Sequence, residues 1–258
     1  MRGYLVAVLI AAPLLFAAGC GGGGEMSLSE YRKSISDLHD GVAWDLGDVV
    51  EELGNLDFGD YYDLLELQEV YRGVNDIFTS AMQEAEVMEP PPQARALQED
   101  LVDFYSEGAD STRELVNALG FFEAVLPMLR DVENLALPAL AEGAGVPEIR
   151  AAASEDRKTM DGYLDELSGM EPPEGLERYR GSLAEFFRSI DEAVAAMAQA
   201  VTPEDRNPFL QFRQWYAAAL DRSRVLWEEA MAYLRAEGGM VDRLIEEGKE
   251  LAGRIQGL

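Results

Sequence analysis

This 258-residue sequence contains one cysteine and one histidine. A single cysteine cannot form a disulfide within the chain, and it excludes the zinc and iron–sulfur motifs that need several cysteines. A single histidine excludes metal sites built on two histidines. That residue, His39, lies beside an apolar helical stripe, and no Gly-x-Ser-x-Gly motif accompanies it. We therefore expect His39 at the boundary of the core and not in the role of a catalytic base.

Basic residues are also scarce. The chain has 21 Lys and Arg residues against 49 Asp and Glu residues, which gives a formal net charge of −28. Nucleic acids and anionic lipid headgroups are recognised by clustered Lys and Arg, so both are excluded as direct partners. Apolar residues make up 48% of the chain, enough to fill the core of one or two domains.

Cofactor-binding and catalytic motifs are missing too. The sequence has no Walker loop, no Gly-x-Gly-x-x-Gly, no His-Glu-x-x-His and no Glu-x-x-His. We therefore expect no enzymatic activity and no bound cofactor. An enzyme that uses two of the many carboxylates stays open as a third hypothesis.

The N-terminus has the pattern of a secretory signal peptide, which we place at residues 1–19. Arg2 provides a basic start, residues 4–18 are apolar, and small residues follow. The apolar stretch is short for a membrane-spanning helix, and Pro13 interrupts it.

Ala17-Ala18-Gly19-Cys20 resembles the lipobox of bacterial lipoproteins. The resemblance covers only this end of the chain, and it departs from the family at Ala17, where Leu is more frequent. It implies that Cys20 carries a covalent diacylglyceryl lipid, with acyl chains such as palmitate, and that Cys20 becomes the first residue of the mature protein. A plain signal peptide or an uncleaved anchor with an incidental cysteine is the alternative.

Four glycines follow Cys20, and we take residues 20–26 as the lipid anchor and a flexible tether of about 10 Å. The membrane, reached through the lipid, is then a partner of the mature protein. We expect it to be secreted and anchored on the outer face of the cell membrane. In an organism with two membranes we expect the outer membrane, because the residue after Cys20 is glycine and not aspartate.

The remainder of the sequence predicts helices throughout. Ser27 and Glu30 form a capping box at the start of a helix that ends before Gly54. Apolar residues recur in this helix at steps of three and four, namely Tyr31, Ile35, Leu38, Val42, Leu46, Val49 and Leu53. Further helices are expected to begin near Asp60, after Pro90–Pro92, near Pro147, near Pro172-Pro173, and near either Thr202-Pro203 or Asn207-Pro208. Pro127 and Pro138 are expected to kink or divide residues 120–142. No strand pattern interrupts them, so the fold class is all-α.

An internal repeat predicts an elongated bundle built from a duplicated helical hairpin with a Pro-Pro turn. Met88-Glu-Pro-Pro recurs 82 positions later, beginning at Met170. Apolar residues follow the two copies of the motif at the same spacing. After the first copy they are Leu97, Leu101, Phe104, Tyr105, Leu115 and Leu119, and after the second copy they are Tyr179, Leu183, Phe186, Phe187, Met197 and Val201. We assign residues 27–201 to the duplicated bundle and residues 202–258 to a C-terminal helical region of the same bundle. Two long helices that happen to begin alike would also give this pattern.

The Pro-Pro turn before a helix is similar to a motif in small helical lipoproteins of Gram-positive bacteria. Many of those proteins have a histidine in the following helix, which this chain lacks. The likeness implies no activity.

Acidic residues concentrate in the N-terminal half, where residues 25–108 hold 21 acidic and 4 basic residues. Asp45, Asp48 and Glu52 share one helical face. Their oxygens could bind Ca²⁺ or Mg²⁺, which makes these three residues candidate metal ligands. A solvated acidic face is the alternative.

The C-terminal third combines arginines with aromatic residues, and Arg213, Trp215, Arg222 and Arg224 are candidate partner-binding residues. A central core helix wrapped by the others is the alternative.

Taken together, these patterns predict a lipid-anchored, non-catalytic binding or scaffold module of the cell envelope, with an envelope protein as a candidate partner. The alternative function is a lipoprotein that binds a divalent cation through its acidic half. The sequence leaves the oligomeric state open.

Overall fold

The computed structural model describes residues 26–53 and 61–258, and it confirms the all-α fold. The structure is 86% helical, and no strand occurs within the described residues. The helices are α1 (Leu28–Leu53), α2 (Tyr61–Glu86), α3 (Arg95–Asp131), α4 (Ala136–Ala139), α5 (Val146–Gly169), α6 (Glu177–Ala200), α7 (Asn207–Gly238) and α8 (Met240–Gln256). The predicted signal peptide, Cys20 and most of the glycine tether lie outside the described residues.

The helix ends follow local sequence signals. At the start of α1, the Ser27 N–H donates to the Glu30 carboxylate at 3.1 Å, and the Glu30 N–H donates to the Ser27 hydroxyl at 3.3 Å. This is the predicted capping box, which satisfies two N–H groups that a helix start leaves free. Proline occupies the first turns of α5 and α7, where a missing N–H costs no helical hydrogen bond.

Residues 120–142 are divided, as expected, but the break does not fall at Pro127. Helix α3 continues through it to Asp131, and the break falls at residues 132–135. Buried neighbours on both sides, Leu126 and Met128, anchor the helix across the proline, so packing offsets the lost hydrogen bond. The chain resumes at α4, where the Asp156 carboxylate accepts the N–H groups of Ala136 and Leu137 at 2.7 and 2.8 Å.

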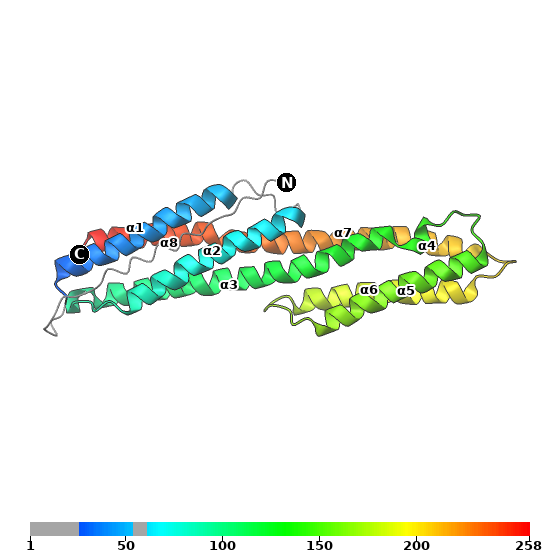
Figure 1. Cartoon of the computed structure of the whole chain (residues 1–258), viewed down its shortest axis with the longest axis horizontal. Helices are drawn as coiled ribbons and strands as arrows, with labels where there is room; N and C mark the ends of the chain where they lie inside the picture. Colours follow the sequence, from blue (N-terminus) through cyan, green and yellow to red (C-terminus); the bar gives the residue numbers. More distant parts are fainter. Residues whose placement is uncertain (1–25, 54–60) are drawn as a thin grey trace, which may run out of the picture.

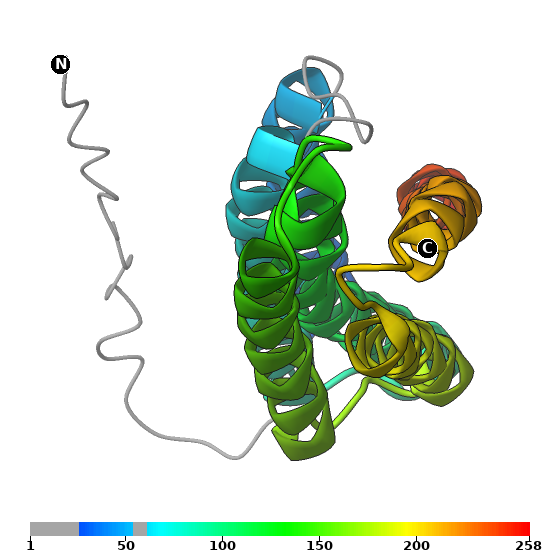
Figure 2. The same cartoon turned by 90° about the vertical axis from the view of Figure 1, so that its right-hand side faces the viewer.

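The molecule is an elongated bundle in which two helical hairpins lie end to end (Figure 1). Helix α2 packs against α3 to form the first hairpin, and α5 packs against α6 to form the second. The long helices α3 and α7 run along the bundle and contact each other. Viewed down the long axis, most helices run close to that axis (Figure 2). Helix α1 stands outside both hairpins and packs against α2 and α8.

The two hairpins share one pattern of burial. Both copies of Met-Glu-Pro-Pro lie in the connection between the two helices of a hairpin. All seven buried residues of α5, from Val146 to Leu167, match buried residues of α2 when the chain is shifted by 82 positions. All seven buried residues of α6 likewise match buried residues of α3. Two unrelated helices that merely begin alike would not align both arms of a hairpin, so this register supports duplication.

At one matched pair of positions the two hairpins differ in how the side-chain volume is divided between the two helices. In the first hairpin Phe78 packs on Gly108, and a Cβ added to Gly108 would lie 2.5 Å from the Phe78 ring. The equivalent residues in the second hairpin are Met160 and Ile190, both fully buried. A large residue facing a small one is thus replaced by two of intermediate size, which keeps the interior close-packed.

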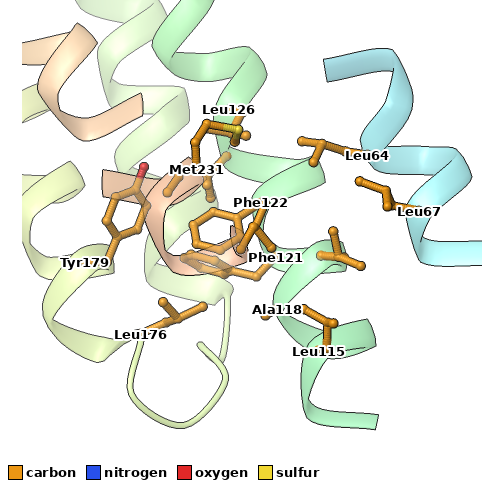
Figure 3. Close-up of a cluster of buried hydrophobic side chains, with 14 of the residues drawn as sticks. Leu64, Leu67, Leu115, Ala118, Phe121, Phe122, Leu126, Leu176, Tyr179 and Met231 are labelled. Carbon is orange, nitrogen blue, oxygen red and sulfur yellow. The ribbon is translucent and has the colours of Figure 1, made fainter. Parts of the chain in front are cut away.

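An aromatic cluster joins the two hairpins at the middle of the bundle. The ring centroid of Phe122 lies 5.4 Å from that of Tyr179 and 5.8 Å from that of Tyr233. Figure 3 shows this cluster with Leu64 of α2 on one side and Met231 of α7 on the other. The cluster therefore contains residues from α2, α3, α6 and α7, and it makes one continuous core of both hairpins.

The Phe78–Gly108 contact yields a first prediction. We expect Gly108→Ala to lower the free energy of unfolding by about 1–3 kcal/mol, because the steric clash outweighs the gain in helix propensity. Gly162→Ala, on α5 with open space around the added carbon, should instead stabilise by up to about 1 kcal/mol. The double change Phe78→Met with Gly108→Ile, which copies the second hairpin, should cost less than Gly108→Ile alone. Urea unfolding measures all four values, and a neutral Gly108→Ala would contradict the contact.

Buried tyrosines give a second prediction. Burial raises the pKa of Tyr31 and Tyr71 from 10.0 to about 12, and Asp242 adds to the shift at Tyr71. A pKa raised by folding favours the folded state below pH 10 and loses that contribution as the pH rises toward 12, because the unfolded chain releases its protons first. Urea unfolding at pH 8 to 11.5 should therefore show little change from these groups up to about pH 9 and a fall in stability above it. Tyr71→Phe should flatten the fall, and an unchanged slope in this variant would contradict the prediction.

Candidate functional site

Helices α1 and α8 form an antiparallel pair at one end of the bundle (Figure 1). Near the start of α1, the Arg32 guanidinium donates to the Gln256 carbonyl at 2.6 Å. Seven residues further on, His39 Nε2 lies 2.8 Å from the Gly248 carbonyl oxygen. Helix α8 is also held to α3 by an ion pair between Arg243 and Glu107, at 3.3 Å.

His39 is buried between three helices and makes two hydrogen bonds. Only 5% of the residue is exposed, so it lies deeper than the core boundary that we expected, because α8 covers this part of α1. The Gly248 carbonyl can only accept, so Nε2 carries the proton in the neutral ring, and the Tyr105 hydroxyl donates to Nδ1 at 3.0 Å. Burial raises the pKa of Tyr105, which keeps its hydroxyl protonated. Both ring nitrogens are thus engaged inside the protein.

An apolar groove of about 340 Å³ lies between α1 and α8 beside His39, and we call it the α1–α8 groove. Its wall on α1 extends from His39 to Val50, its wall on α8 from Leu244 to Ala252, and Phe104 of α3 contributes to its lining. The groove exists because residues that line it on both helices are small. They are Ala43 and Gly47 on α1, and Gly248 and Ala252 on α8. Nothing lies within 4 Å of the place where a Gly47 side chain would begin.

Asp40 and Lys249 are the charged residues that line this groove. Asp40 accepts a hydrogen bond from the Ser36 hydroxyl at 3.3 Å, while Lys249 is paired with Glu246 at 2.6 Å. The three charged groups Asp40, Lys249 and Glu246 sum to −1. One turn after Asp40 on the same side of α1 lies Trp44, the second most exposed of the exposed large apolar residues, at 74%.

A second hollow, of about 760 Å³, lies at the first Pro-Pro turn and is more polar. Its lining residues include Glu86, Glu89, Glu99 and Asp103, together with Arg95. Within the part of the chain that the structure describes, however, no three acidic, histidine or cysteine side chains are grouped to hold a metal ion. We therefore regard the α1–α8 groove as the better candidate site.

The three candidate metal ligands lie on α1. Asp45 and Asp48 are exposed, and the side chain of Glu52 lies outside the described residues. Residues 26–53 and 61–258 contain no cluster that adds ligands to them. Cation binding at this face stays a prediction.

The candidate partner-binding residues are spread along α7 and do not converge on one point. Each arginine lies near a carboxylate, at 3.7 Å for Arg213 and Glu142, 3.8 Å for Arg222 and Glu229, and 3.2 Å for Arg224 and Asp221. Trp215 is partly exposed, whereas the aromatic residues Phe209, Phe212 and Tyr216 are buried. Helix α7 thus has a buried aromatic stripe and an outer face of neutralised arginines, and an interface on that face stays a prediction.

The sequence contained a signal for the α1–α8 groove that we did not use. Ala43 and Gly47, and likewise Gly248 and Ala252, are small residues four positions apart on their helices. Their significance depends on the pairing of α1 with α8, which are separated by almost the whole chain. That pairing could not be derived from local patterns.

Comparisons with known proteins add no assignment, since the chain matches no protein-family model, no curated protein and no solved structure. Among the described residues, no helix is long and apolar enough to cross a membrane.

The buried histidine gives a third prediction. His39→Leu should lower the free energy of unfolding by about 1–3 kcal/mol, because it leaves the Gly248 carbonyl and the Tyr105 hydroxyl without their partner. Tyr105→Phe alone should cost about 1 kcal/mol. In the double variant the loss of free energy of unfolding should be smaller than the sum of the two single losses, because no buried hydroxyl is left without a hydrogen-bond partner.

Urea unfolding of the two single variants and the double variant measures this coupling. Tyr179→Phe is the control, because its hydroxyl donates to the Leu226 carbonyl at 2.9 Å in a different part of the bundle. This change should add to His39→Leu without coupling. If the free-energy changes of Tyr105→Phe and His39→Leu add as fully as those of Tyr179→Phe and His39→Leu, the result would argue against the hydrogen bond between Tyr105 and His39.

Proposed function

We propose that this chain is a lipid-anchored, extracytoplasmic protein of the cell envelope that acts by binding and not by catalysis. The observation that carries the proposal is Cys20, the only cysteine of the chain, at the end of an apolar N-terminal stretch and within a lipobox-like sequence. A cysteine with no other role in folding or metal binding is free to accept the lipid.

The geometry of the bundle supports a membrane-near position for the α1–α8 groove. The start of α1 and the end of α8 lie together at one end of the molecule (Figure 1). Met26, which packs against the core, is only the sixth residue after Cys20, and six residues span at most about 20 Å. An anchored chain therefore presents the α1–α8 end of the bundle to the membrane, and the end near α4 points away from it.

Two observations support binding in preference to catalysis. Both ring nitrogens of His39 are occupied by hydrogen bonds within the protein, so the ring is not available as a base in this state. The α1–α8 groove has an apolar lining with few polar groups, which suits a ligand held by burial.

The anchoring is tested by expressing the full chain in a bacterium fed with an alkyne fatty acid. The wild-type protein should incorporate the fatty acid and remain in the membrane fraction after a high-salt wash. Cys20→Ser should lose the label completely, because the thioether needs the thiol. Ala17→Leu, which restores the residue more frequent in lipoboxes, is the matched control and should label at least as well as the wild type. Equal labelling of Cys20→Ser, or an unlabelled wild-type protein, would refute the proposal.

A further inference from the structure

We propose that the α1–α8 groove binds a single-chain amphiphile with a cationic head, its alkyl chain in the groove and its ammonium group between Asp40 and Trp44. This inference rests on the proposed binding function and names its ligand class. It does not depend on the lipid at Cys20.

The dimensions of the groove select one alkyl chain. Its lining on α1 extends from His39 to Val50, which corresponds to about 16 Å along the helix. A volume of about 340 Å³ lies at the lower end of the range for small-molecule sites, so the groove has room for one extended alkyl chain and not for a bulky ligand. An α-helix with its side chains is about 10 Å wide, so a partner helix needs a larger space than this groove offers.

The lining of the groove is suited to hydrocarbon. Val42, Leu46 and Val50 of α1 face Leu244 and Ile245 of α8 across it. The polar atoms of His39 that could reach the groove are already bonded to Tyr105 and Gly248. A ligand polar along its length would therefore lose its hydrogen bonds to water without replacement, and an alkyl chain would not.

The charges beside the α1–α8 groove favour a cationic head group. The positive charge of Lys249 is neutralised by Glu246, and the Asp40 carboxylate leaves a local negative charge. Trp44 lies one turn away, and an indole face attracts an ammonium group. The net charge of −28 adds a field that repels anions from the whole surface. A fatty-acid carboxylate is disfavoured by all three features, and a quaternary ammonium is favoured.

The test uses the full chain in nanodiscs of zwitterionic lipid, with a dodecyl-trimethylammonium probe that carries a diazirine in its chain. After irradiation and trypsin digestion, the adducts should concentrate on the peptides 34–72 and 244–249, which contain the α1 wall and most of the α8 wall of the groove. Dodecyl probes with a hydroxyl or a carboxylate head should label these peptides less, the carboxylate least. A rigid four-ring sterol probe should label them less than the ammonium probe, since it is bulkier than one extended alkyl chain.

Two glycines of α1 provide a matched pair of variants. Gly47→Leu fills the groove, and Gly41→Leu places the same side chain on α1 outside it; both glycines have open space around them. Both changes should raise the melting temperature through helix propensity, which shows that folding is intact. Labelling of the two peptides should fall at least fivefold in Gly47→Leu and by less than twofold in Gly41→Leu.

The head-group site is tested with a second pair of variants. Asp40→Asn should lower labelling by the ammonium probe twofold to fivefold and leave the hydroxyl probe unchanged. Asp37→Asn, an exposed position on α1 outside the groove lining, should change neither. Labelling that survives Gly47→Leu, or equal labelling by the carboxylate probe, would overturn the inference.

The same digests report the lipid on Cys20 through the mass of the N-terminal peptide. A missing lipid with a labelled groove would refute the anchoring and leave the ligand class standing. A lipidated protein with an unlabelled groove would refute the ligand class and leave the anchoring standing. If the groove is labelled only after Cys20→Ser, the protein's own acyl chain fills it, and a free amphiphile is not its ligand.

Discussion

The fold depends on one helix, α3, which continues without a break past the end of α2 and contacts the second hairpin. Its 37 residues extend about 55 Å, longer than α2, so its last turns project beyond the first hairpin. Phe122 lies close to the point where α3 leaves α2, with Leu64 on one side, and its ring meets those of Tyr179 and Tyr233. Without these contacts the two hairpins would meet only at their ends, with little apolar surface to bury. The buried side chains around Pro127 therefore serve the whole molecule, because they keep the helix continuous at the junction.

Much of this architecture could be predicted from the sequence, because hairpins depend on local signals. The capping box at Ser27, the apolar stripes and the two Pro-Pro turns are each contained within about 30 residues. The burial pattern of α2 and α5 extends the repeat beyond the positions at which sequence identity is visible. The position of the break within residues 120–142 could not be predicted, because the packing that carries α3 past Pro127 comes from other helices.

The candidate site lay beyond such reasoning because it is formed by the two ends of the chain. The apolar stripe of α1 predicted that one face of this helix would be covered. It did not predict that α8 would cover it, nor that small residues on both helices would leave a space beside His39. The depth of His39 has the same origin, because its Gly248 partner is more than 200 residues away in sequence. The pairing of the termini thus produces both the buried polar bridge and the apolar groove.

Because the hairpins lie end to end, the molecule is longer than a compact bundle with the same number of residues. Helices α2 and α5 together correspond to about 75 Å of axial length. For a chain anchored as we propose, the loops around α4 would be held within a fixed distance of the anchor point on the membrane. Tethering of this kind raises the local concentration of one surface-bound partner around another to about the millimolar range. Contacts made at the far end of the bundle could therefore be individually weak and still be occupied most of the time.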